Sequence, residues 1–479
     1  MPFFLRVLVP PGLTEGAVTP ASKGPCLREM PAAKCRWVST PGRSIIKTLL
    51  GLLLWTAALP SAPSAPAPES WVSEYPRVGA RAEQDCARPD LSACRRELLR
   101  LAALLDNRTD IVYRLAKVEA RLGHVAASLR YLKSYASSQL DLGDPATQPE
   151  FQALYAVPQF RQLEQIYRAG LAPRGAHLRL AVAPAADLVA EDLALDERSG
   201  VRFLSSVHLG KVLMLDSQGQ WSDFARPDEL SAWGIYALSV DTAHDRLWLS
   251  TVAGEVSPPF HVADKGRSAI LRFDLSTRKV EQRYELGDGH PHAFGDMALG
   301  PKGELYASDG VGGGLYSVGT GPDAAIVTLV SPGALRSPQT PVPLPAATRL
   351  LVADYSRGIA VIDLVRPNRV SWLQHGPELA VYGIDGLYLT GRTLIAIQNG
   401  TVPERLLFMH LDPSLTRVVG WQVALARAPG LGDPTHGVVR KDRFEFISNS
   451  GWDRVDDQGR LTQSVPGAPA ELWSVELPK

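Results

Sequence analysis

The chain has 479 residues, 45% of them hydrophobic and 21% charged, and its 50 basic residues balance 50 acidic ones. A chain of this length and apolar content can bury a large core and is not a disordered protein. Balanced charge provides no overall field that would attract phosphate backbones or anionic lipid, so nucleic acid is not expected as a partner.

Residues 1–67 are predicted to hold a leader and a secretory signal. Arg43 and Lys47 precede an apolar run at 48–59, which small residues and prolines follow. That run is short of the roughly 20 residues that cross a bilayer, so an uncleaved anchor is the weaker alternative and the mature chain should have no membrane span. The signal lies unusually deep, and a true start at Met30 would explain its position. We expect a periplasmic or extracellular protein.

The remaining cysteines agree with export. Beyond the predicted signal the chain contains only Cys86 and Cys94, in "DCARPDLSACRREL". An even pair at short spacing in an exported protein indicates a local disulfide. Two buried thiols in helices are the alternative, because spacing alone does not show that the side chains face one another.

Residues 86–170 show helical spacing of apolar side chains. One stripe in "IVYRLAKVEARLGHVAASLRYLKSYAS" consists of Leu115, Val118, Leu122, Leu129 and Leu132. Such a stripe predicts two amphipathic helices that turn near Gly123, with a loop and a terminal helix in "DPATQPEFQALYAVPQFRQLEQIY". The small and apolar positions at Leu115, Ala116, Gly123 and Ser128 resemble a tetratricopeptide repeat. That resemblance implies a groove for a protein partner. A helix pair packed on the next domain is the alternative.

Residues 175–479 are predicted to be all β, because the apolar period changes to two. Six segments repeat the same alternation of short strands and polar turns, among them "VRFLSSVHLGKVLML", "DRLWLSTVAGE" and "RTLIAIQNGTVPERLLFMHL". Six such units in a ring predict a six-bladed propeller of four-stranded sheets. "HLRLAVAP" precedes the first full repeat and should close the ring as a strand beside "LWSVEL".

One position before each predicted innermost strand is equivalent in all six repeats. The six residues there are Glu191, Tyr236, Gly295, Gln339, Asp385 and His436. Innermost strands line the channel of a propeller, so these residues should face one another around its mouth.

Oxygen ligands in this ring predict a divalent cation. The residues Glu191, Gln339 and Asp385 offer two carboxylates and an amide, the chemistry that calcium prefers. The alternative is that Glu191 and Asp192 merely solvate a strand end. Strand alternation is expected to turn Asp192 away from the side that Glu191 faces.

Other candidates could handle protons or substrate. His436 is the ring's histidine and, with Asp385 and Asp296, is a candidate acid or base. Tyr236, His292 and Gln339 are candidate residues at the mouth.

Further motifs bear on the class of chemistry. His290 and His292 surround a proline that favours a loop, and a zinc pair there lacks a clear third ligand. Asn399 and Trp452 lie in similar blade turns. The chain has no Gly-x-Ser-x-Gly elbow and no cysteine in its β half. Serine or cysteine hydrolysis therefore loses most of its support.

The order of the motifs "EDLALD", "FGDMALGPKGELYASD" and "GIDGLYL" resembles the six-bladed propellers of the senescence marker protein, gluconolactonase and paraoxonase superfamily, and is similar to NHL-repeat propellers. This resemblance covers about residues 185–477. It implies a calcium-like ion held by Glu191 and Asp385. The chain departs from the family pattern at Gln339, which replaces an asparagine ligand, and at Gly295, which replaces a substrate-side asparagine but is followed by Asp296.

Two functions follow from these patterns. The first is a divalent-metal-dependent hydrolase of a lactone or small ester, in which the ion stabilises the oxyanion and Asp385, Asp296 or His436 handles the proton. The second is a non-catalytic secreted propeller that binds a protein or a carbohydrate. Exposed aromatic side chains at the mouth would favour binding, and a closed acidic pocket that holds a metal would favour catalysis.

Overall fold

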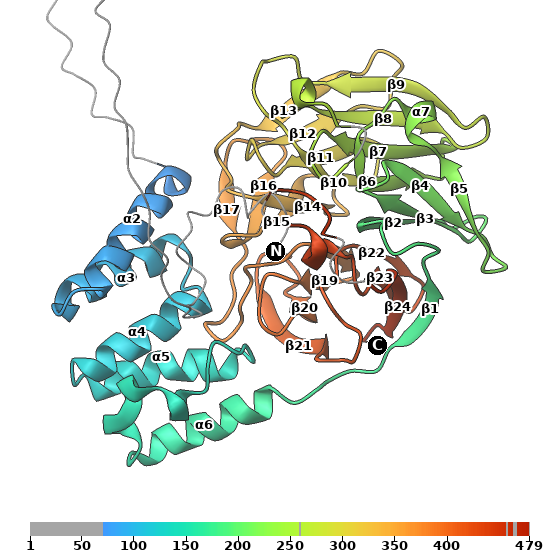
Figure 1. Ribbon diagram of the computed structural model, residues 1–479. Coiled ribbons are helices and arrows are strands. Elements are labelled where there is room, and N and C mark those ends of the chain that lie inside the picture. The colour runs from blue at the N-terminus through green and yellow to red at the C-terminus, as the bar shows by residue number, and fades with distance from the viewer. Residues whose placement is uncertain (1–69, 258–259, 457, 463–466, 479) are drawn as a thin grey trace, which may run out of the picture. The chain divides into compact units, whose positions relative to one another are not determined.

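A computed structural model describes residues 70–257, 260–456, 458–462 and 467–478. The predicted leader, the signal and Met30 lie outside the described residues. From Ser70 onward the described chain forms one compact unit, in which helices come first and strands follow (Figure 1). None of the helices in the described part is both long and apolar enough to cross a membrane.

The helical region begins earlier than the sequence predicts. Its α-helices are α2 (Trp71–Cys86), α3 (Leu91–Leu104), α4 (Thr109–Arg121), α5 (Val125–Ser137) and α6 (Pro158–Gly170), with 3₁₀ turns η1 (Pro145–Thr147) and η2 (Pro149–Leu154) before α6. Side-chain caps from Ser70 and Asp90 begin α2 and α3. The predicted turn between two amphipathic helices joins α4 to α5, where Gly123 has a φ of +79° that suits glycine.

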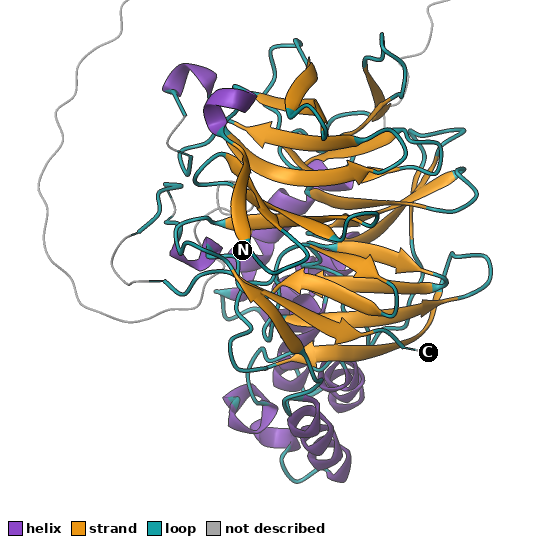
Figure 2. Ribbon diagram, turned by 90° about the vertical axis from the view of Figure 1, so that its right-hand side faces the viewer, coloured by secondary structure: helices purple, strands orange, loops and turns teal. Residues whose placement is uncertain are grey.

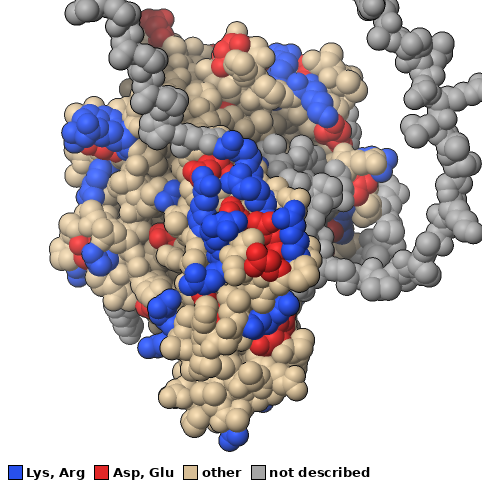
Figure 3. Space-filling model, turned by 90° about the vertical axis from the view of Figure 1, so that its left-hand side faces the viewer, with Lys and Arg blue, Asp and Glu red and all other residues tan. Residues whose placement is uncertain are grey.

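A disulfide joins Cys86, the last residue of α2, to Cys94 in α3. The buried face of this helix pair contacts α4 in one apolar cluster, and α4, α5 and α6 form a second. Acidic and basic side chains mix on the helical surface (Figure 3). Arg95 pairs with Glu119 at 2.7 Å and Arg114 with Glu83 at 2.6 Å. These basic side chains are therefore neutralised locally.

The strands form six four-stranded antiparallel sheets, which confirms the predicted propeller (Figure 2). The first three blades are built in chain order from β2 (Ala190–Asp196), β3 (Val201–Ser206), β4 (Lys211–Leu215) and β5 (Trp221–Ala225); β6 (Gly234–Asp241), β7 (Arg246–Val252), β8 (Ser268–Asp274) and β9 (Lys279–Glu285); and β10 (Phe294–Leu299), β11 (Leu305–Asp309), β12 (Leu315–Val318) and β13 (Ile326–Val330). Two short helical turns lie between strands, α7 (Pro227–Leu230) and η3 (Val262–Asp264).

The last three blades follow the same order until the ring closes. Their strands are β14 (Pro338–Pro343), β15 (Arg349–Asp354), β16 (Gly358–Asp363) and β17 (Val370–Trp372); β18 (Leu387–Thr390), β19 (Thr393–Gln398), β20 (Arg405–Leu411) and β21 (Val418–Ala426); and β22 (Gly437–Arg440), β23 (Arg443–Ile447), β24 (Glu471–Glu476) and β1 (Leu178–Val182). A 3₁₀ turn, η4 (Trp452–Arg454), lies between β23 and β24.

Strand β1 closes the ring as predicted. It pairs antiparallel with β24, with Leu178 opposite Ser474 and Val182 opposite Glu471. A strand from before the first blade thus completes the last one, so that the sheet is not left short of an edge strand.

The helices are bound to the propeller through backbone carbonyls. Arg405, at the start of β20, is fully buried and donates to the carbonyl of Ser138 at 2.7 Å. Arg108 donates to the carbonyl of Ser356 at 2.9 Å. The helical region is therefore held against the blades by specific hydrogen bonds.

Candidate functional site

The six equivalent positions lie where the innermost strands begin. The residues Glu191, Tyr236, Gly295 and Gln339 are early residues of β2, β6, β10 and β14, and Asp385 and His436 come just before β18 and β22. Each innermost strand contacts the innermost strands of its two neighbouring blades, so the six form a closed channel. All six positions therefore lie at the same end of the innermost strands.

The first residues of several innermost strands depart from regular pairing. The ladder shifts between Ala190 and Leu193 in β2, and comparable shifts occur near the start of β6, β10 and β14. A bulge re-aims the side chains on either side of it. Simple alternation therefore does not decide which side chain faces the channel at these points.

A compact group of possible metal ligands lies at this end of the channel. Glu191, Asp385 and His436 each offer one ligand atom, and the three atoms lie within 4.8 Å of one another. All three residues are buried, with 7%, 1% and 3% exposure respectively. Among the residues that the structure describes, this is the one group of at least three such side chains close enough to share an ion.

Two side chains that the sequence indicated only as turn residues hold these carboxylates. The indole nitrogen of Trp452 donates to Oε2 of Glu191. The amide of Asn399 donates to Oδ2 of Asp385 at 2.7 Å and to the carbonyl of Pro434 at 3.0 Å. Asn399 in turn accepts from the hydroxyl of Tyr355 at 3.1 Å. Each carboxylate thus has one oxygen fixed by the protein.

The other carboxylate oxygen of Asp385 accepts no hydrogen bond from the described residues. This atom, Oδ1, is buried. Burial raises the pKa of Asp385 to about 6, and burial together with the charge of Asp385 raises the pKa of Glu191 well above its usual range. An unpartnered buried oxygen between two acids fits a cation, which would bind the oxygen and remove the repulsion.

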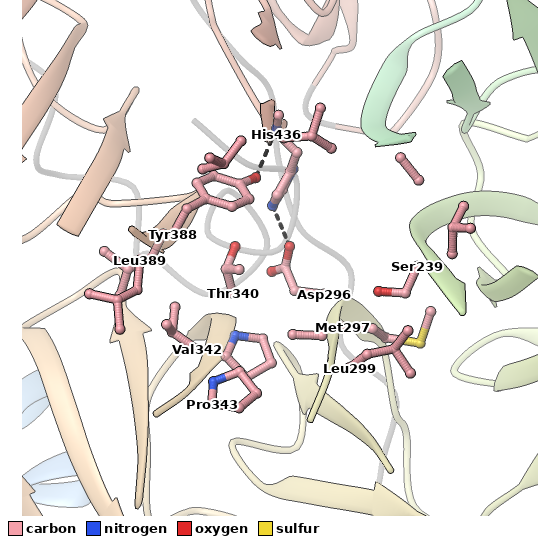
Figure 4. A pocket seen from close by; sticks show the side chains of 18 of the residues that line it. Ser239, Asp296, Met297, Leu299, Thr340, Val342, Pro343, Tyr388, Leu389 and His436 are labelled. Atoms are coloured by element: carbon pink, nitrogen blue, oxygen red, sulfur yellow. Dashed lines mark hydrogen bonds and ion pairs between the residues drawn. The ribbon is translucent and has the colours of Figure 1, made fainter. Parts of the chain in front are cut away.

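His436, just before β22 of the last blade, contacts one residue of the first blade and one of the third. Its Nδ1 lies 3.0 Å from the carbonyl of Glu191 and therefore carries a proton, and Nε2 forms an ion pair with Asp296. Burial by itself would lower the pKa of this imidazole, but the charge of Asp296 and its hydrogen bond raise it well above the usual value. Two of the predicted acid or base residues are therefore in direct contact (Figure 4).

Gln339 is buried near the start of β14. Its amide nitrogen donates to the hydroxyl of Ser337 at 3.0 Å and to the carbonyl of the same residue at 3.3 Å. The amide oxygen is then the atom that Gln339 could offer to a cation. The cluster also contains an imidazole, which the expected ligand set of Glu191, Gln339 and Asp385 lacked.

Strand alternation predicts that Asp192 turns away from the side that Glu191 faces, and thus away from the channel. The structure differs from this expectation. Asp192 lines the channel cavity, and its carboxylate accepts from the backbone N–H groups of Leu193 and Leu238, both at 2.7 Å. Burial raises its pKa to about 6. The ladder shift beside it breaks the alternation on which the expectation rested.

Two candidate mouth residues have other surroundings. The structure does not bring His292 into the cluster, since its ring nitrogens lie 2.6 Å from Asp309 and 2.9 Å from Asp288. Tyr236 is fully buried in an apolar cluster, where its ring lies 6.1 Å from that of Trp452. Tyr236 thus lies next to Trp452, whose indole donates to Glu191.

Residues further along the innermost strands line a cavity of about 640 Å³. Figure 4 shows His436 and Asp296 pointing toward one another between the surrounding strands. Side chains from all six innermost strands line the cavity. The cavity therefore meets the cluster at the ion pair of His436 and Asp296.

No family model and no curated protein matches this sequence. Among solved structures the chain is similar to a luciferin-regenerating enzyme (12% identity, 64% of this chain and 95% of the other, TM-score 0.44), a glucose dehydrogenase (12%, 64% and 100%, 0.44) and a candidate gluconolactonase (14%, 63% and 91%, 0.41). These likenesses lie at the level of the fold. The expected superfamily resemblance is confirmed at that level by the six four-stranded blades.

Proposed function

We propose that this chain binds a divalent cation at Glu191, Asp385 and His436 and hydrolyses a lactone or a small ester there. The observation that carries the proposal is the convergence of three ligand atoms within 4.8 Å, one side chain among them having a buried oxygen without a partner. Buried like charges are costly unless a counter-charge joins them. A cation is the simplest counter-charge at this position.

The donor set bears on which cation binds. Two carboxylates and the amide oxygen of Gln339 suit calcium, whereas the imidazole of His436 also suits manganese or zinc. We keep calcium as the first candidate, because two of the three clustered ligands are carboxylates.

The cation and the side chains around it would have different roles in the hydrolysis. A bound cation supplies a Lewis acid that polarises the ester carbonyl and stabilises the developing oxyanion. His436 would hold the cation through Nε2, because its Nδ1–H donates to the carbonyl of Glu191. Asp296, no longer paired with a protonated imidazole, would accept a proton from the attacking water and return it to the oxygen that leaves the acyl carbon. Water adds across the acyl–oxygen bond, and a lactone thereby opens to a hydroxy acid.

Metal content tests the binding step directly. Elemental analysis of protein purified without chelator should find about one divalent ion per chain. Glu191→Gln and Asp385→Asn should each weaken metal binding by about a hundredfold, and Asp323→Asn, an exposed acid in a blade turn, should not. Wild-type protein that binds neither calcium, manganese nor zinc would contradict the proposal.

The reaction is tested with a neutral lactone such as γ-nonanoic lactone. Hydrolysis should need the cation and should fall by about a hundredfold in Asp296→Asn, because general acid–base catalysis typically contributes 10²–10⁴-fold. Equal activity of Asp296→Asn and wild type at saturating metal would refute the role of this carboxylate.

A non-catalytic binding protein is the second candidate, and the burial of the cluster favours it. Trp452 covers one carboxylate, and none of the three side chains exceeds 7% exposure. A cation at so closed a position would stabilise the ring without meeting substrate. In that case removal of the metal would lower the melting temperature, while no lactone or ester would be hydrolysed at any metal concentration.

We also propose that the protein is exported, with a mature N-terminus between about Ala58 and Glu69. The basic, apolar and small-residue order of residues 43–67 supports this, as does the disulfide of Cys86 and Cys94. N-terminal sequencing of native protein tests the cleavage, and non-reducing peptide mapping tests the cysteine pair. Intact residues 1–57 on native protein would contradict export.

A further inference from the structure

The channel cavity has the size of a small-molecule pocket. Its volume of about 640 Å³ falls within the roughly 300–1,000 Å³ typical of such sites. Its inner end is formed by the side chains of Asp296 and His436, which form an ion pair. A ligand in the cavity would meet this pair before it could reach Glu191.

The walls beyond the inner end are apolar. Every innermost strand contributes at least one aliphatic side chain to the lining, for example Leu195, Val240, Leu299, Val342, Leu389 and Val439. A ring of aliphatic side chains favours the apolar body of a ligand, because its burial removes apolar surface from water.

Apart from Glu197 and Ser239, the polar side chains of the cavity lie at its inner end, and most of these are already engaged. The hydroxyl of Thr340 donates to the carbonyl of Asp385 at 2.9 Å, and Asp192 accepts from two backbone N–H groups. The hydroxyl of Tyr388 accepts from the N–H of Gly437 at 2.8 Å. Its own hydrogen remains for a ligand, which would therefore present an acceptor at this point.

The charges of the lining exclude an anion. Asp192, Glu197 and Asp296 line the cavity, and none of the described lining residues is a lysine or an arginine. His436 is the one cationic group among them, and Asp296 already pairs with it. A ligand carboxylate or phosphate would therefore be desolvated beside acids without a free basic partner.

We propose that this cavity binds an uncharged ligand with an extended apolar body and one polar end, which accepts a hydrogen bond from Tyr388. The chemical class is that of fatty alcohols, neutral long-chain esters and alkyl lactones. The inference goes beyond the proposed hydrolysis, because it holds for a non-catalytic protein as well and needs no cation.

Fluorescence titration with the neutral probe N-phenyl-1-naphthylamine tests the proposal on the whole chain, with and without chelator. The probe should bind, and 1-decanol should displace it. Displacement by decanoate, which differs in its charged end, should require about tenfold more ligand. The chelator should not change these results.

Two blocking variants locate the site. Ala298→Trp on β10 and Ser239→Trp on β6 place a large ring in the cavity at partly exposed positions. Both should abolish probe binding while thermal melting shows that the chain is folded. The matched control is Val327→Trp on β13 of the same blade as Ala298, at a position with 56% exposure outside the cavity. It should bind the probe like wild type.

The proposal is overturned if wild type does not bind the probe, or if decanoate displaces it as well as decanol does. Undiminished binding in a folded blocking variant would also overturn it, as would loss of binding in Val327→Trp. Because binding is measured without hydrolysis, a failed lactonase assay does not affect the result.

Discussion

His436 and Asp296 form an ion pair across the central channel, although they belong to opposite blades of the ring. His436 comes just before β22 in the last blade, and Asp296 lies in β10 of the third. Both side chains are only 4% exposed. The pair therefore crosses the channel and connects two sheets that share no ladder.

Loss of either partner should destabilise the fold. His436→Gln and Asp296→Asn should each lower the free energy of unfolding by about 3 kcal/mol, because each leaves a buried group without its counter-charge. The double variant should cost clearly less than the sum of the two. Urea unfolding of the four proteins measures the coupling, and additive effects would contradict a direct pair.

Asp192 should matter for stability, because its buried carboxylate accepts two backbone hydrogen bonds. Asp192→Ala leaves the buried N–H groups of Leu193 and Leu238 without acceptors and should lower the free energy of unfolding by about 2–4 kcal/mol. Asp187→Ala, an exposed acid just before the same strand, is the control and should change little. Equal denaturation midpoints for these two variants would show that the contacts of Asp192 are weak.

His292 should stabilise the third blade in a pH-dependent way. Its hydrogen bond to Asp309 raises its pKa from 6.5 to about 9, even though burial opposes the shift. A folded-state pKa above the unfolded one means that the stabilisation is complete below pH 6.5 and is lost as the pH rises through 9.

His292→Gln should therefore lower stability by about 2 kcal/mol at pH 6, the scale of a hydrogen bond between charged groups. The difference from wild type should shrink as the pH approaches 9. Urea unfolding of both proteins from pH 6 to 9.5 measures it. A difference that does not change over this range would refute the role of the charged imidazole.

Arg405 should hold the helices against the fifth blade. Arg405→Met would leave the carbonyl of Ser138 and the side-chain oxygen of Gln398, each 2.7 Å from the guanidinium, without a donor. Limited proteolysis should then cut the connection at residues 171–177 faster than in wild type. Arg392→Met, at an exposed position of the same blade, is the control. Unchanged cleavage in Arg405→Met would mean that other contacts suffice.

The sequence by itself determined the architecture of this protein. Period-two alternation repeated six times requires six sheets, and a spare strand before the first repeat requires a place in the last blade, which β1 takes. These features depend on local pattern and on the need to bury strand edges, both of which are present in the linear order of residues. The same reasoning placed Glu191, Asp385 and His436 in one channel.

Only the tertiary structure decided what surrounds those side chains. Trp452 and Asn399 belong to turns whose pattern predicts a bend and not a contact. Trp452 reaches Glu191 from the last blade to the first, and Asn399 reaches Asp385 within the fifth blade. The direction of Asp192 depends on a local shift in pairing that alternation does not encode. The physical reason is that strand period is a property of neighbouring residues, whereas a contact between blades depends on the registers and loops of several sheets together.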